Sequence, residues 1–166
     1  MPILKKNNKY QYTNKNYDCK GFVNCTEKYL NKDIYIYKKY CHRGYVLSEV
    51  AYLKQKKNGI ERRYSFFFNR KRIEWEYLYI NGELQGIAIG FSKYLYLLQE
   101  IPFKDNKKNG IFRAYYNNGL IGSSDAFVNG KELNQPEVYN YDGTPFWKKK
   151  SKIELVQNTR YTGRLL

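Results

Sequence analysis

The chain has 166 residues, of which 30 are lysine or arginine and 15 are aspartate or glutamate, so its net charge is +15. No stretch approaches the roughly 18 apolar residues of a spanning helix, and the first residues lack a signal-peptide core. The three cysteines, Cys19, Cys25 and Cys41, together with the single His42 reach the minimum ligand count for zinc, but no C-x-x-C spacing is present. We therefore expect free thiols, no cofactor, no metal and a cytoplasmic location.

Residues 1–16 are polar, basic and rich in asparagine. Tyr10 and Tyr12 alternate as they would in a strand. This segment is predicted to be either a disordered lead-in or an irregular first hairpin.

An aromatic side chain then recurs at a nearly constant interval. The steps are 12 residues, with one of 11 and one of 15, over the following positions: Tyr17, Tyr29, Tyr40, Tyr52, Tyr64, Tyr79, Phe91, Phe103, Tyr115, Phe127 and Tyr139. Twelve residues make one strand plus one turn, so consecutive units form β-hairpins. The prediction for residues 17–143 is an all-β fold, an elongated and twisted antiparallel meander of about ten strands.

The two halves of the 24-residue period differ in the residues that precede the aromatic ring. One half has an isoleucine four positions earlier, and the other has an acidic or hydroxyl residue three positions earlier. These residues are Ile36, Ile60, Ile87 and Ile111, and Glu49, Glu76, Glu100 and Ser124. By strand alternation, the isoleucine shares a face with its ring, whereas the glutamate lies on the opposite face.

Two copies of K-K-N-G, at 56–59 and 107–110, are predicted to place tight Asn-Gly reversals on one edge of the sheet. Lys56, Lys57, Lys107 and Lys108 would project from that edge. The opposite edge would carry Arg70, Lys71 and Arg72, inside a three-residue insertion. These seven cations are either solvated turn residues or a positive rim that binds an acidic partner.

Two further segments depart from the repeat. Phe66, Phe67 and Phe68 put apolar rings on both faces of a strand, so we expect part of that arm to be covered. Residues 144–166 contain Trp147 and a basic run at 148–152. They are predicted to cap the last hairpin, with a basic partner-binding tail as the alternative.

The pattern G-I-F-R-A-Y-Y-N-N-G-L at 110–120 and F-V-N-G-K at 127–131 resembles the MORN-type repeat. The short bacterial form of that repeat occurs in YwqK-like antitoxins. The segment Y-I-N-G-E-L-Q-G at 79–86 also resembles the repeat well. The resemblance as a whole covers residues 29 to 143. The resemblance implies a hairpin-repeat fold and an antitoxin or immunity-type protein that neutralises its partner by binding.

No catalytic constellation is found around the single histidine, so the first hypothesis is a non-catalytic interaction module with an acidic protein partner. A second hypothesis is binding of nucleic acid or inhibition of a nuclease, with Arg62, Tyr64 and Phe66 as a stacking platform. A third, less favoured, is a peripheral binder of anionic membranes.

Overall fold

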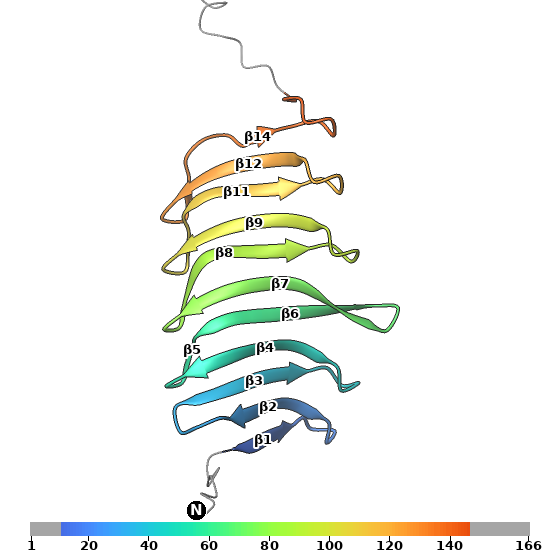
Figure 1. Ribbon diagram of the computed structural model, residues 1–166, viewed down its shortest axis with the longest axis vertical. Coiled ribbons are helices and arrows are strands. Elements are labelled where there is room, and N and C mark those ends of the chain that lie inside the picture. Colours follow the sequence, from blue (N-terminus) through green and yellow to red (C-terminus); the bar gives the residue numbers. More distant parts are fainter. Residues whose placement is uncertain (1–10, 147–166) are drawn as a thin grey trace, which may run out of the picture.

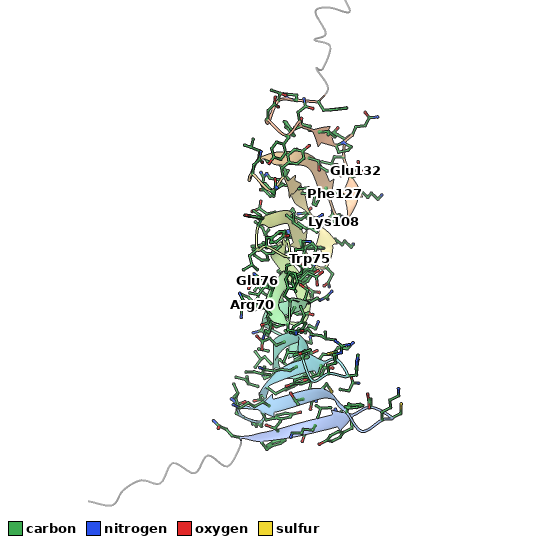
Figure 2. All side chains as sticks on the ribbon, turned by 90° about the vertical axis from the view of Figure 1, so that its right-hand side faces the viewer. Arg70, Trp75, Glu76, Lys108, Phe127 and Glu132 are labelled. Atoms are coloured by element: carbon green, nitrogen blue, oxygen red, sulfur yellow. The ribbon has the colours of Figure 1, made fainter. Side chains whose placement is uncertain are left out.

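The computed structural model describes residues 11–146, and every regular element in that range is a β-strand. The strands form one open antiparallel sheet in chain order, which confirms the predicted meander. Figure 1 shows an elongated ribbon with β1 and β14 at opposite ends, and Figure 2 shows its twist. The strands are β1 (Tyr12–Tyr17), β2 (Val23–Tyr29), β3 (Ile34–Tyr40), β4 (Val46–Leu53), β5 (Lys56–Lys57), β6 (Gly59–Phe67), β7 (Arg70–Ile80), β8 (Glu83–Phe91), β9 (Leu97–Lys104), β10 (Lys107–Lys108), β11 (Gly110–Tyr115), β12 (Ile121–Val128), β13 (Lys131–Glu132) and β14 (Glu137–Val138).

The two K-K-N-G copies do not form the reversals that the sequence predicts. The chain turns at Lys54–Gln55, with φ angles of 49° and 65°, and at Asp105–Asn106, with φ angles of 51° and 66°. Asn58–Gly59 and Asn109–Gly110 instead join β5 to β6 and β10 to β11. Only the glycines take positive φ there, at 109° and 122°, so each Asn-Gly pair marks a bulge within a continuing strand.

The asparagines of these bulges hold the next turn along the sheet. The Oδ1 of Asn58 accepts a hydrogen bond of 3.1 Å from the backbone N–H of Asn81, and the Oδ1 of Asn109 does the same for Asn129. Backbone bonds of 2.8 Å from Gly82 and Gly130 accompany them. We call this edge, with turns at 54–55, 81–82, 105–106 and 129–130, the lysine edge. Its hairpins are therefore tied together beyond the strand ladder itself.

The two faces of the sheet carry different rows of side chains. On the tyrosine face, the rings of Tyr12, Tyr29, Tyr35 and Tyr52 stack in sequence at 4.5, 4.9 and 4.7 Å between centroids. On the glutamate face, Lys38, Arg62 and Arg113 form ion pairs with Glu49, Glu76 and Glu100. Figure 2 shows Trp75 and Glu76, adjacent in β7, pointing to opposite sides. The predicted separation of rings and glutamates onto opposite faces is confirmed for Tyr52 and Glu49 by their place in these two rows.

No second layer covers either face within residues 11–146. The most buried side chains in that range are those of Cys25, Val50, Glu61, Tyr64 and Ala88, and no large side chain is fully enclosed. Cross-strand pairs and ring stacks therefore supply most of the apolar burial in place of a shared core.

The sheet extends beyond the predicted repeat at its first strand, because β1 begins at Tyr12. At the other end, Pro145 forms an isolated bridge with Tyr139. Tyr10, Trp147 and the basic run at 148–152 lie outside the described residues.

Asn58→Ala is expected to lower the free energy of unfolding by about 1 kcal/mol, because the backbone N–H of Asn81 loses its acceptor. Asn58→Asp keeps an acceptor oxygen and is the matched control, which should change stability much less. Urea unfolding followed by circular dichroism measures both. Equal losses for the two variants would show that the side-chain oxygen does not stabilise the turn.

Candidate interaction surface

The four lysines that the sequence analysis placed on the lysine edge divide into two kinds. Lys56 and Lys107 are exposed. The amine of Lys57 lies 4.6 Å from the centroid of the Tyr79 ring, and that of Lys108 lies 4.7 Å from the centroid of Phe127. Figure 2 shows the proximity of Lys108 and Phe127. The structure thus brings the four lysines to one edge, but two of them pack on rings of the tyrosine face.

Lys57 also contacts the most buried charge of the described residues. Glu61 is 4 % exposed, and its carboxylate accepts bonds from Lys57 Nζ at 2.5 Å and Arg63 Nε at 3.0 Å. Burial alone raises the pKa of Glu61, but these two cations outweigh it and hold the pKa below its ordinary value. Lys57 is therefore part of the folded framework and cannot be treated as a free rim charge.

The cations of the insertion lie on the opposite edge, which we call the arginine edge. Arg70 and Lys71 are exposed, and the amine of Lys71 lies 3.7 Å from the centroid of the Tyr64 ring. The Nε of Arg72 is buried and has no hydrogen-bond partner among the described residues. The three insertion cations thus have different surroundings, and Arg70 is the most available of them for a partner.

The proposed stacking platform is occupied by bonds within the protein. The hydroxyl of Tyr64 donates to Glu49, and Arg62 pairs with Glu76 at 2.7 Å. Burial and the Glu49 carboxylate both raise the pKa of Tyr64. Because Lys71 covers one face of the ring and Tyr64 as a whole is buried, no ring face is open to a nucleic-acid base.

The arginine edge also carries an apolar cluster that the sequence analysis missed. We name it the aromatic corner, and its residues are Phe67, Phe68, Tyr94, Leu95 and Tyr96. The three-residue insertion lengthens the β6–β7 hairpin, which reaches past its neighbours on the right of Figure 1. The expectation is that part of the arm with the three phenylalanines is covered: Phe66 and Phe67 are half-buried, whereas Phe68 is 85 % exposed. The sequence does contain one sign of this cluster: Leu95 occupies the turn position that holds glycine in four equivalent turns.

The thiols and acids of residues 11–146 do not gather into a metal site. Cys19 is exposed, Cys25 is buried and Cys41 is intermediate, and all three are free. Within the described range, no group of three or more histidine, cysteine or acidic side chains lies close enough together to hold a metal ion. The same range contains no helix of the length and apolarity needed to cross a membrane.

Comparisons with known proteins do not place the chain in a family. No family model matches it, and no curated protein does either. Two crystal structures of TarM are similar in part, one of them a point mutant from S. aureus in complex with Fondaparinux, alpha-GlcNAc-glycerol and UDP. Identities are 20 % and 19 %, and TM-scores are 0.41 and 0.42. Each match covers 67 % of this chain and only 21 % of the TarM chain.

Glu61→Gln is expected to reduce stability at pH 7 by about 1–3 kcal/mol, because it removes a charged acceptor from Lys57 and Arg63. A carboxyl with a depressed folded pKa stabilises the fold above its unfolded value of about 4.3 and loses that contribution as pH falls through the folded pKa. The difference between wild type and variant should therefore shrink below pH 4.

Thermal unfolding between pH 3 and pH 8 measures this difference. Glu83→Gln, at the exposed first position of β8, is the control and should leave the pH profile of the wild type unchanged. A Glu61→Gln profile that runs parallel to the wild type down to pH 3 would contradict the account of this ion cluster.

Proposed function

We propose that this protein is a non-catalytic interaction module that binds an acidic protein partner. The observation that carries the proposal is how the charges are distributed. Arg62, Arg63 and Lys57 on the sheet faces are paired with glutamates, whereas Lys56, Lys107 and Arg70 at the edges are exposed and have no ion pair among the described residues. Unpaired cations at the rim of a surface favour complementary acidic partners and speed their association.

The biological class of this module is an antitoxin or immunity-type inhibitor that neutralises its partner by occupying it. Its support is the resemblance of residues 110–120 and 127–131 to the short bacterial MORN-type repeat. An extended single-layer sheet suits such a task, because its edges and both its faces are open to a partner. A cytoplasmic location and the absence of catalysis belong to the same proposal.

Charge reversal at each edge tests the electrostatic part of the proposal. We expect Lys56→Glu with Lys107→Glu, or Arg70→Glu alone, to slow association with the acidic partner, and to slow it more at low salt. The reversals should change the unfolding midpoint little, because exposed charges contribute little to stability. Lys57, Lys71 and Lys108 are left intact because they pack on rings.

The measurement is affinity capture from the native host, followed by surface plasmon resonance at several salt concentrations with the captured protein. Retention of wild-type association rates by both variants would contradict recognition through the edges. Capture of RNA or DNA, with a salt slope that becomes shallower in the variants, would favour the nucleic-acid hypothesis instead.

A further inference from the structure

The aromatic corner is built from two neighbouring turns of the arginine edge. The ring of Phe67 lies 4.4 Å from that of Phe68 and 5.8 Å from that of Tyr94, measured between centroids. Tyr94 and Tyr96 lie 6.4 Å apart. The extended β6–β7 hairpin and the β8–β9 turn therefore share one apolar surface, although 27 residues separate Phe67 from Tyr94 in the chain.

Two residues of this corner stand in backbone positions that disfavour them. Phe68 has φ of 48° at the first position of a two-residue turn, where asparagine, aspartate or glycine is preferred. Leu95 has φ of 66° in a three-residue turn, at the position that holds glycine in four other turns. Those glycines are Gly21, Gly44, Gly119 and Gly143, with φ of 77–84°.

The same two side chains gain little from burial within the protein. Leu95 is 51 % exposed, and Phe68 is more exposed still. A bulky apolar residue that is both strained and exposed costs stability twice, first through its backbone and then through its hydration. Selection for folding alone would favour asparagine or aspartate at position 68, as at Asn81, Asp105 and Asn129 in three of the four turns of the lysine edge, and glycine at position 95. The corner thus has the composition of a binding surface rather than of a turn.

The charge around the corner has a single sign. The amine of Lys93 lies 5.0 Å from the centroid of Phe67 and 5.2 Å from that of Tyr94. Arg70 stands opposite Phe67 in the β6–β7 register. Neither cation has an ion pair among the described residues, and the sequence has no acidic residue in 62–73 or 84–99.

We propose that the aromatic corner is the docking site for an acidic peptide segment of the partner protein, in which an apolar side chain is flanked by carboxylates. The apolar side chain would pack on Phe68 and Leu95, and the carboxylates would pair with Lys93 and Arg70. This inference rests on the proposed function and assigns its site.

The ring geometry favours a peptide over a single-stranded nucleic acid. The rings of the corner meet at interplanar angles of 61°, 78° and 52°. Successive bases need a row of ring faces on which to stack, and edge-to-face rings do not present one. Such rings form instead the uneven apolar surface that receives a protein side chain.

The test is a selection of random 12-residue peptides displayed on phage, with the full-length wild-type chain as target. The double variant Phe68→Asn, Leu95→Gly serves for counter-selection. We expect enriched peptides to contain a tryptophan, phenylalanine or leucine flanked by aspartate or glutamate. An enriched synthetic peptide should bind the double variant about tenfold or more weakly than wild type in fluorescence anisotropy.

The double variant should at the same time unfold at a higher temperature than wild type, because both turns gain their preferred residues. Loss of binding with a gain of stability separates a binding role from a structural one. Ile80→Asn is the matched control, because it removes an apolar side chain of 49 % exposure from the lysine edge. It should leave peptide binding unchanged.

Three results would overturn the inference: no enrichment over the counter-selection, enrichment of basic or uncharged peptides, or equal affinity of the peptide for the double variant. Binding of oligo(dT) or of phosphatidylserine vesicles that is lost in the double variant, without peptide binding, would reassign the corner to those ligands. If the captured partner still binds the double variant with wild-type affinity, the proposed function stands and only this site is wrong.

Discussion

The structure depends on pairing between neighbouring strands in a sheet that has no second layer within residues 11–146. Each strand can bury side chains only against the two strands beside it, so rings and ion pairs must lie across strands. The Tyr12–Tyr29–Tyr35–Tyr52 stack and the Lys38–Glu49 and Arg62–Glu76 pairs serve this purpose on the two faces. Asn58 and Asn109 extend the same pairing to the turns.

This constraint also separates structure from function on the surface. Charged side chains on the two faces form ion pairs within the sheet, as the buried Glu61 between Lys57 and Arg63 illustrates. At the lysine edge, Lys56 and Lys107 are exposed and have no ion pair among the described residues, so they contribute little to strand pairing. Phe68, in the lengthened β6–β7 hairpin, and Leu95, in the neighbouring β8–β9 turn, violate the local turn preferences. A local cost without a folding benefit is what supports our proposal that these two turns bind a partner.

Much of the fold follows from the sequence, because strand alternation is a local rule. The aromatic interval predicts the meander, and the parity of Glu49 and Tyr52 predicts their opposite faces. The prediction of Asn-Gly reversals is wrong. Gly59 and Gly110 provide the positive φ of bulges, and the preceding asparagines accept hydrogen bonds from the next turn. Both uses need the same dipeptide, so composition alone does not distinguish them.

The surface is less predictable than the fold, because its side chains depend on neighbours that are distant in the chain. Lys57 packs on Tyr79, 22 residues later, and Lys108 packs on Phe127, 19 residues later. The aromatic corner likewise joins two turns whose register is set by the whole β6–β9 segment. Comparison of equivalent turns within the repeat would have singled out Leu95, because glycine occupies that position in the others.

Native-state hydrogen exchange of the full-length chain, followed amide by amide, tests the central claim most directly. If stability comes from neighbouring strands, protection should be greatest in β6–β8 and decline stepwise toward β1 and β12, with local openings well below the global value. Uniform protection from β1 to β12 would contradict this account, because it would require one cooperative core that spans the whole sheet.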